Sequence, residues 1–413
     1  MKTYTEIKEG HPTILTEWMA RLIEYRVILY GAAALGQAVK KALGNHGINV
    51  YGFWDLRHNE IDGAVEPYTT GDPSNTLVIL CVGNTILQPE IVKEIQEHGY
   101  EHIMLGDLVY QALGCPLTDR VDGDACLRGP CRAIYCKRLQ DIVKANCPPK
   151  ADPPLFLHSI TFVINQKCSL VCKYCSSYMN EYPAEDRVNF PKEQVIADIK
   201  AFFAAVDGVG TITVMGGEPF LHPDLSEIIQ AILDCKNFGV ISISTNGICK
   251  IKPSQLPALQ DSRVNVSFSN YLSEVTEAQR DLFWRNIELL RSYGVPYTIG
   301  EPGPYWIVPS TLDVSDGVSV ETLIQRKKDC DPVRCVQVKN GIIYPCDFIN
   351  AVQCLNLGDY VDSRIHIGGA LRADLLDFLS QDYYSACERC KGYGGSTRKA
   401  GEQGYVNMLG GEK

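Results

Sequence analysis

A regular alternation of short apolar segments and amphipathic segments runs from Leu155 to Pro309 and limits the fold more than any other feature of the chain. The apolar segments are rich in β-branched residues, which favours strands. They cover residues 159–164, 211–215, 240–244, 264–268 and 296–300. The helices predicted between them include Lys192–Ala205, Leu225–Lys236 and Ala278–Tyr293. Strands and helices in series form a parallel sheet that can close into a full or partial barrel, so we predict an α/β fold.

Three cysteines follow the first of these strands within eight residues. Cys168, Cys172 and Cys175 have the spacing Cys-x3-Cys-x2-Cys and are predicted to lie on the loop at the carboxyl end of the strand, where α/β barrels place their chemistry. Thiolates are soft ligands that select iron–sulfur clusters, zinc or Cu(I). Because a closed [4Fe-4S] site takes four thiolates, three of them would leave one iron open to another ligand. A zinc knuckle or buried free thiols are the alternatives.

A glycine-rich run follows the next strand: Gly216-Gly217-Glu218-Pro219. Two glycines let a ligand approach the backbone closely, and a carboxylate beside them can accept from an ammonium. The cysteine run has an aromatic residue, Tyr174, as its second spacer before the last cysteine. The two runs, in this order, resemble the radical S-adenosylmethionine (SAM) superfamily.

The resemblance implies a partial, six-stranded (β/α) barrel in which the three cysteines hold a [4Fe-4S] cluster next to Tyr174. SAM would bind the open iron through its amino and carboxylate groups. Gly216, Gly217 and Glu218 would hold the SAM ammonium. One electron from the cluster, supplied by a flavodoxin or ferredoxin-type donor, would cleave SAM to methionine and a 5′-deoxyadenosyl radical that abstracts a substrate hydrogen.

The third strand ends in a run whose Ser244 and Asn246 would face the SAM ribose by the same resemblance. Asn246 precedes Gly247, and Asn-Gly is a common turn pair. A strand-end turn is therefore the alternative interpretation of this run.

A second group of cysteines lies in the last hundred residues. Asn340-Gly341 between two apolar runs predicts a hairpin. The cysteine order around this hairpin resembles the SPASM/twitch extension of radical SAM enzymes, and the absence of cysteines after residue 390 favours the shorter twitch form with one auxiliary [4Fe-4S] cluster. Cys335 is the reserve ligand, and a zinc site of four thiolates is the alternative. The predicted ligands are Cys330, Cys346, Cys387 and Cys390.

The first 115 residues predict a separate Rossmann-like α/β domain. Gly31 and Gly36 open a helix after a strand, and Asp55 follows the next strand. This order resembles the nucleotide-sugar-binding domain of some sugar acyltransferases and epimerases. Ala33 stands where a glycine would let a pyrophosphate approach, so nucleotide-sugar binding and a structural role are both open.

The chain is thus divided into four predicted parts. Residues 1–115 form the Rossmann-like domain, 116–154 a cysteine-bearing linker, 155–310 the radical SAM partial barrel, and 311–413 the small Cys-rich twitch-type domain. The remaining cysteines are expected to bind no metal, and those considered are Cys81, Cys126, Cys131, Cys136, Cys235, Cys249 and Cys354.

Composition limits the partners. A net charge of −10 over 413 residues argues against nucleic acid, whose partners usually carry a basic face. The sequence has no apolar run near the roughly 20 residues of a membrane helix and no signal-peptide segment. Seventeen cysteines would be unusual for a cytosolic chain unless many bind metal. We expect a cytoplasmic metalloprotein without a membrane partner.

Two further residues are candidates for positioning substrate or moving protons. Glu301 and Tyr271 each follow a predicted strand end, although an exposed Glu and a packing Tyr are the simpler interpretations. The leading hypothesis is oxidation or epimerisation of a small metabolite, a sugar or nucleotide-linked sugar, because of the Rossmann-like domain. A peptide-modifying radical SAM enzyme is the alternative, and a non-catalytic metal-bound scaffold ranks last.

Overall fold

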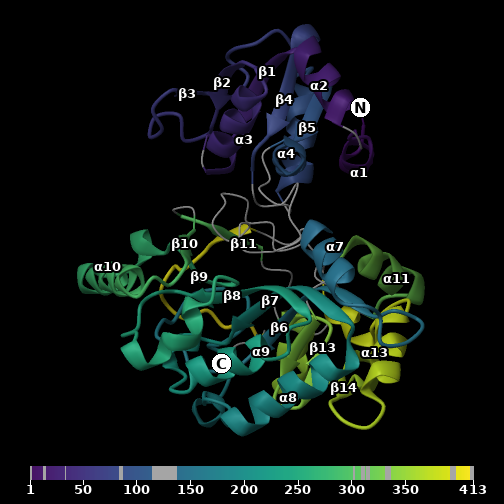
Figure 1. Cartoon of the computed structure of the whole chain (residues 1–413), viewed down its shortest axis with the longest axis vertical. Helices are drawn as coiled ribbons and strands as arrows, with labels where there is room; N and C mark the ends of the chain where they lie inside the picture. Colours follow the sequence, from purple (N-terminus) through teal and green to yellow (C-terminus); the bar gives the residue numbers. More distant parts are fainter. Residues whose placement is uncertain are drawn as a thin grey trace. The chain divides into compact units, whose positions relative to one another are not determined.

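A computed structural model gives the fold (Figure 1). It describes residues 2–12, 15–32, 34–82, 87–113, 137–300, 303–307, 312, 317–330, 336–390 and 397–409. These residues fall into two compact units, the first reaching to Leu113 and the second beginning at Lys137.

The first unit is a five-stranded parallel sheet with helices between the strands. Its strand order is β3-β2-β1-β4-β5, which is the order of doubly wound nucleotide-binding folds. The predicted α/β class with parallel sheets is confirmed. In chain order the elements are α1 (Tyr4–Glu9), α2 (Leu15–Glu24), β1 (Arg26–Tyr30), α3 (Ala34–Asn45), β2 (Val50–Trp54), β3 (Ala64–Val65), β4 (Thr76–Leu80), α4 (Gln88–Glu97), β5 (His102–Leu105) and α5 (Gly106–Leu113).

The turn after β1 is packed against its own chain. A Cβ on Gly36 would lie 1.9 Å from the carbonyl oxygen of Gly31, so α3 needs a glycine there. The buried Asp55 carboxylate accepts hydrogen bonds from the backbone N–H of Ala32 and of Arg57, each at 2.9 Å. Asp55 therefore joins the turn to the end of β2. Position 33 lies outside the described residues.

The second unit is built on one eight-stranded sheet. Five parallel strands are neighbours in chain order: β6 (Phe156–Val163), β7 (Gly208–Met215), β8 (Phe238–Thr245), β9 (Val264–Phe268) and β10 (Tyr297–Ile299). The connecting helices are α8 (Lys192–Ala205), α9 (Leu225–Leu233) and α10 (Glu277–Ser292).

The sixth parallel strand differs from the expected serial barrel. β12 (Val336–Lys339) pairs in parallel with the free edge of β6, and β13 (Ile342–Tyr344) and β14 (Ile365–His366) extend the sheet antiparallel. Val336 and Val338 lie opposite Ile160 and Phe162, so two apolar rows continue one another across the pair. The hairpin predicted at Asn340-Gly341 thus forms part of the barrel sheet.

Part of the predicted linker is helical. α7 (Lys137–Asn146) packs on the start of β7, where a Cβ on Gly208 would lie 2.3 Å from the Cγ1 atom of Val143. The glycine therefore lets this helix approach the sheet. Cys126, Cys131 and Cys136 lie outside the described residues.

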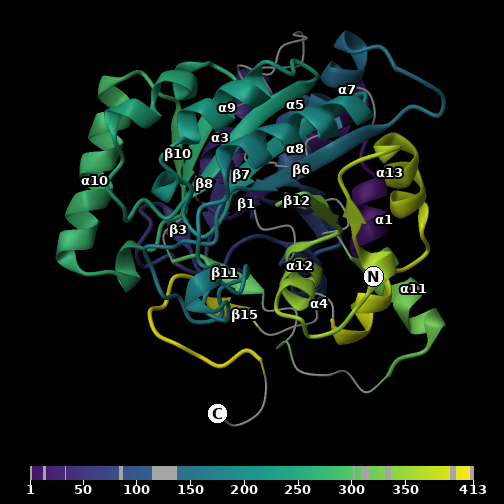
Figure 2. The ribbon, with the colours of Figure 1, turned by 90° about the horizontal axis from the view of Figure 1, so that it is seen from below.

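The two faces of the barrel sheet differ. Phe162 packs on Phe202 of α8 with ring centroids 5.8 Å apart, and Phe268 packs on Phe283 of α10 at 5.2 Å. These residues define the outer, helix-covered face. Figure 2 shows α8, α9 and α10 along this side, with α12 (Asp347–Cys354), β11 (Tyr305–Ile307) and β15 (Thr397–Lys399) on the opposite, inner side.

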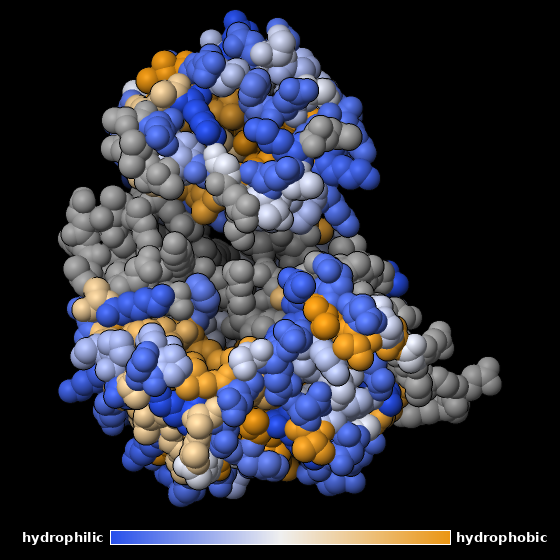
Figure 3. Space-filling model, turned by 90° about the vertical axis from the view of Figure 1, so that its right-hand side faces the viewer, coloured by the Kyte–Doolittle hydropathy of each residue, from blue (hydrophilic) through white to orange (hydrophobic). Residues whose placement is uncertain are grey.

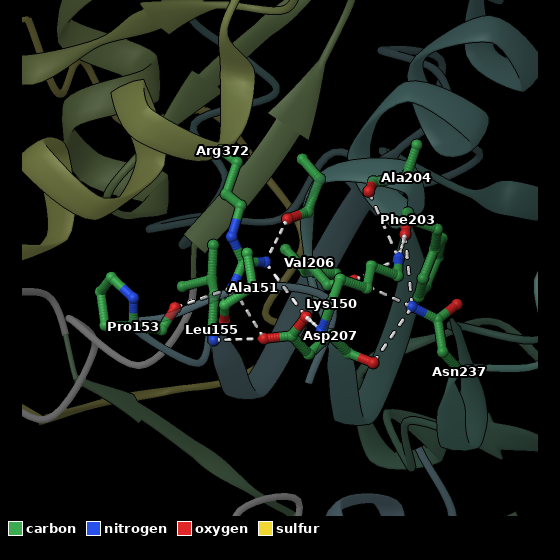
Figure 4. A network of polar contacts seen from close by, with 11 residues as sticks. Lys150, Ala151, Pro153, Leu155, Phe203, Ala204, Val206, Asp207, Asn237 and Arg372 are labelled. Atoms are coloured by element: carbon green, nitrogen blue, oxygen red, sulfur yellow. Dashed lines mark hydrogen bonds and ion pairs between the residues drawn. The ribbon is translucent and has the colours of Figure 1, made fainter. Parts of the chain in front are cut away.

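A polar network closes the carboxyl end of α8 (Figure 4). Lys150 Nζ donates to the carbonyl oxygens of Phe203 and Val206, both at 2.6 Å. Arg372, at the start of α13 (Leu371–Ser380), donates to Ala205 O at 2.9 Å and forms an ion pair with Asp207 at 2.9 Å. Three segments far apart in sequence therefore meet at the amino-terminal end of the barrel strands.

Hydrophilic side chains cover much of the face seen in Figure 3, and apolar ones form separate patches. Among the described helices, none has the length and apolar character needed to cross a membrane.

Candidate active site

The three cysteines of the first run lie on the loop that leaves the carboxyl end of β6. Cys172 is buried, and Cys168 and Cys175 are half-buried. Burial, with smaller contributions from the Glu218 carboxylate and the Cys175 and Cys172 thiols, raises the pKa of Cys168 to about 12. The thiols therefore lie close enough to interact. Among the described residues, no three Cys, His or acidic side chains, these thiols included, already surround a single metal position.

The surroundings of the sulfur atoms fit a cluster. Backbone N–H groups of the loop donate to Cys168 and Cys175. Side-chain amides come from elsewhere: Asn246 Nδ2 lies 3.7 Å from Cys168 Sγ, and Gln403 Nε2 lies 3.4 Å from Cys172 Sγ. Sulfur atoms that ligate iron–sulfur clusters accept such N–H groups, which also tune the cluster. A [4Fe-4S] group therefore suits this donor set.

Tyr174 has a positive φ of 53°, and the guanidinium carbon of Arg398 lies 5.2 Å from its ring centre. Its predicted contact with a cofactor stays a prediction.

The two glycines after β7 permit a close approach between strand-end loops. A Cβ on Gly216 would lie 2.0 Å from Asn165 Oδ1, and one on Gly217 would lie 2.2 Å from Lys167 O. Gly217 N also donates to Asn165 Oδ1 at 3.2 Å. The glycines thus bring the loop after β7 against the loop that carries the cysteines, and their expected contact with the SAM ammonium stays a prediction.

Glu218, the expected ammonium ligand, is hydrogen-bonded within its own chain. Its side chain is fully buried, and its carboxylate accepts from Thr245 Oγ1 at 2.7 Å, Asn246 N at 2.9 Å and Phe220 N at 3.1 Å. Burial raises the pKa of Glu218 to about 7, although these hydrogen bonds oppose the rise. The carboxylate therefore joins the ends of β7 and β8, and its expected contact with the SAM ammonium stays a prediction.

The run after β8 forms the turn that was the alternative interpretation. Asn246 is 8% exposed, and its Oδ1 accepts from Ile248 N at 2.7 Å and Ser169 Oγ at 3.2 Å. Its side chain is thus engaged in the turn and in the cysteine loop. Ser244 lies half-buried on the inner face of β8, so it remains a candidate for the SAM ribose.

Of the two substrate candidates, Glu301 lies outside the described residues. Tyr271 is half-buried, and its ring packs edge-on against Trp306 with centroids 5.6 Å apart. Burial raises the pKa of Tyr271, and the nearby Cys172 and Cys175 thiols add to this. Tyr271 therefore lies near the cysteine loop.

The second cysteine group gathers around the start of α12. Burial raises the pKa of Cys346 well above its usual value, and the thiols of Cys330, Cys387 and Cys390 raise it further. All four predicted ligands thus lie near one another, and a set of four thiols suits either an iron–sulfur cluster or zinc. The reserve ligand Cys335 lies outside the described residues.

Sequence reasoning missed the residues that contact the cysteine loop from the end of the chain. Gln403 and its neighbours are more than 220 residues away from the loop. No local pattern marks such a contact, because strand-like pairing over this distance depends on the fold.

Comparison with known proteins finds one family and several partial relatives. Residues 162–304 match the sequence model described as "Radical SAM superfamily". The chain is 29% identical over 164 residues to molybdenum cofactor biosynthesis protein moc-5 of Caenorhabditis elegans, covering 35% of this chain and 26% of that protein. It is 33% identical over 117 residues to a probable GTP 3′,8-cyclase of Archaeoglobus fulgidus, covering 28% and 37%.

The antilisterial bacteriocin subtilosin biosynthesis protein AlbA of Bacillus subtilis is 29% identical over 153 residues, covering 34% of this chain and 32% of that protein. The chain thus spans between about a quarter and two fifths of the length of these relatives. A solved structure of anSMEcpe with bound AdoMet is 14% identical, covers 56% of this chain and 88% of its own, and has a TM-score of 0.36, too low for a comparison of sites. Residues 162–304, which match the radical SAM superfamily model, contain both the cysteine loop and the glycine run.

Proposed function

We propose that this protein is a radical SAM enzyme that abstracts hydrogen from the neutral, hydroxyl-bearing part of a small molecule, either a free sugar or the sugar of a nucleotide-linked sugar. When bound to Cys168, Cys172 and Cys175, a [4Fe-4S] cluster would supply the electron that cleaves SAM to methionine and a 5′-deoxyadenosyl radical. The observation that carries the substrate class is the polar inner face of the barrel sheet.

Strand register places hydroxyl and amide side chains in rows on this face. Thr161 lies opposite Thr213, Thr213 opposite Ser242, and Ser242 opposite Asn265. The apolar residues that alternate with them pack against the helices. Exposure on the inner face increases toward the carboxyl ends of β7, β8 and β9. The rows therefore form a polar sheet surface that leads toward the cysteine loop.

Asn265, on the inner face of β9, has a hydrogen-bond acceptor without a donor. The side-chain Nδ2 donates to Thr298 Oγ1 at 3.0 Å, but Oδ1 is buried and has no partner. The residue is 5% exposed. A buried acceptor without a donor costs about 1–3 kcal/mol. A substrate hydroxyl would remove this cost by donating to Oδ1 after the covered side chain turns toward the inner face.

The charge of the inner face favours a neutral group. In the described strands β6 to β10, the inner-face side chains are Ser, Thr, Asn, Met, Val, Leu and Phe, without Lys or Arg. A triphosphate, as in the substrate that the name GTP 3′,8-cyclase states for a relative, would find no counter-charge on this face. The neighbouring strand β12 carries Lys339, which is 4% exposed. Its ammonium group donates hydrogen bonds to Tyr182, Asn350 and Cys354 and so has partners within the protein.

The experiment measures 5′-deoxyadenosine in anaerobic reactions of the reconstituted protein with SAM and dithionite or flavodoxin. UDP-glucose, UDP-N-acetylglucosamine, glucose and myo-inositol form one arm, and a mixture of synthetic peptides forms the other. We expect stimulation above background in the first arm only. Stimulation by peptides alone would favour the alternative class, to which the match with AlbA belongs.

The role of Asn265 is tested in the same assay. Asn265→Leu keeps the side-chain volume but removes the amide, and we expect the substrate KM to rise tenfold or more. Asn59→Leu, at an exposed loop position of the first unit, is the matched control. Equal KM values in Asn265→Leu and the wild type would remove Asn265 from the substrate site.

A further inference from the structure

The end of the described chain forms a strap against the cysteine loop. The strap comprises residues 397–409 and begins with β15, which pairs antiparallel with β11 (Figure 2). Lys173 N donates to Glu402 O at 2.7 Å, and Gly404 N donates to Val171 O at 2.7 Å. These two bonds pair the strap with the loop backbone around Cys172 in the manner of antiparallel strands.

Ion pairs and hydrogen bonds hold the strap on both sides of this pairing. Lys173 Nζ lies 2.5 Å from Glu402 Oε1, and Lys399 Nζ lies 2.5 Å from Glu274 Oε1. Glu181 accepts from Met408 N at 3.2 Å and from Tyr405 Oη at 3.3 Å. The strap is therefore fixed in register over its length.

Gln403 occupies the centre of the pairing and has its side chain held at both ends. Its Oε1 accepts from Val171 N at 3.1 Å, and its Nε2 donates to Gly401 O at 2.6 Å. The same Nε2 lies 3.4 Å from the Sγ atom of Cys172, whose residue is 8% exposed. The amide orientation is set by Val171 N, which requires an oxygen, so the N–H groups face Gly401 and the sulfur.

We propose that Gln403 is a positioning residue that sets the reduction potential of the cluster held by Cys168, Cys172 and Cys175. The proposal rests on the cluster assignment made under the proposed function. An N–H donor stabilises negative charge on a thiolate, and the reduced cluster carries one more negative charge than the oxidised one. The hydrogen bond is therefore stronger in the reduced state and makes the potential less negative.

The hydrogen bond from the strap can be removed by a side-chain substitution, whereas those from the loop backbone cannot. Cys175 accepts from backbone N–H groups of its own loop, which no side-chain change removes. The donor to Cys172 Sγ comes from a residue 231 positions away. A single substitution in the strap can therefore change the sulfur environment without changing the cysteine loop.

The test compares midpoint potentials of the full-length, anaerobically reconstituted protein by EPR-monitored titration. Gln403→Met keeps the length of the side chain without an N–H donor. Gln403→Glu keeps the acceptor for Val171 N but brings a negative charge toward Cys172. We expect the potential to become more negative in Gln403→Met and more negative still in Gln403→Glu.

Tyr405→Phe is the matched control, because it removes one strap anchor without changing charge or the amide. We expect its potential to equal that of the wild type. A wild-type potential in both Gln403 variants, or an equal shift in Tyr405→Phe, would overturn the proposal. If the wild type formed no [4Fe-4S] cluster that binds SAM, the proposed function would fail first, and the EPR signal distinguishes the two failures.

Discussion

At the residue scale, the ends of β7 and β8 are joined by one buried carboxylate. Glu218 accepts from Thr245 and Asn246, which lie 27 and 28 positions further along the chain. The same loops carry the glycines that contact the cysteine loop. A change in the charge of Glu218 is therefore expected to act on the position of the whole strand-end region.

The pH dependence of folding tests this role. The pKa of Glu218 is about 7 in the folded protein and 4.5 as an ordinary Glu, so the unfolded carboxyl ionises first as pH rises. The wild type should lose about 3 kcal/mol of unfolding free energy between pH 4.5 and 7 through this group. We expect Glu218→Gln to lack this loss.

Urea titrations of the metal-free protein at pH 5 and pH 7.5, under reducing conditions, measure the difference. Glu227→Gln, at an exposed position of α9, is the control and should follow the wild type. Identical pH slopes in the wild type and Glu218→Gln would show that the carboxylate faces solvent or ligand, as first expected from the sequence.

Residue spacing predicts the two runs that form the candidate site but not the hydrogen-bond partners of their side chains. The cysteine run and the glycine run are short enough to be recognised in the sequence, and each follows its predicted strand. Burial of Glu218 and the turn around Asn246 depend on the distance between two loops, which the sequence does not give. A carboxylate beside two glycines looks the same in sequence whether it binds a ligand or its own chain.

At the element scale, α8 ends among groups from three distant segments (Figure 4). Its last carbonyl oxygens would otherwise lack partners, and Lys150, Asn237 and Arg372 donate to them. Asp207 is 1% exposed and pairs with Arg372. Burial alone would raise the pKa of Asp207, but hydrogen bonds from Arg372 and from backbone N–H groups lower it below its usual value.

Removal of Arg372 should therefore be costly. Arg372→Met leaves a buried charge without its partner, and we expect a loss on the order of 3 kcal/mol or more in unfolding free energy at pH 7. The double variant Arg372→Met with Asp207→Asn should recover part of it. Because the folded pKa of Asp207 is lowered, the pair stabilises the fold above pH 3.8 and loses this effect as pH falls further.

Denaturant unfolding at pH 7 and pH 3 measures both effects. Arg291→Met, which removes an exposed ion pair with Glu288 on α10, is the matched control and should cost under about 1 kcal/mol. A similar small loss in Arg372→Met would mean that the network does not hold α13 to the barrel.

Elements within the repeating strand–helix pattern were predictable because their period is local. The strap and the parallel pairing of β12 with β6 were not, since both join segments more than 170 positions apart. We predicted a linker where helix α7 lies. The helix packs on the sheet over Gly208, and a pattern of strands and helices does not show that a glycine will accept a helix there.

At the scale of the whole second unit, two cysteine groups lie at different places in one chain. The first follows β6, and the second gathers around Cys346 at the start of α12. Tyr178, 1% exposed, contacts both regions: its backbone N–H donates to Cys175 O at 2.9 Å, and its ring packs on Phe348 of α12 with centroids 6.0 Å apart. The two proposed metal sites should therefore lie close together, and each should bind iron through its own cysteines.

Metal content of cysteine variants tests this division. The wild type should bind about eight iron atoms as two [4Fe-4S] clusters, and the triple variant of Cys168, Cys172 and Cys175 to Ala about four. This variant should form no 5′-deoxyadenosine, because the open iron would be absent. The reciprocal variant Cys387→Ala with Cys390→Ala should keep the iron of the first site and its SAM-dependent EPR change. Loss of all iron from the triple variant would exclude an auxiliary cluster, and one zinc atom retained in its place would identify the second group as a zinc site.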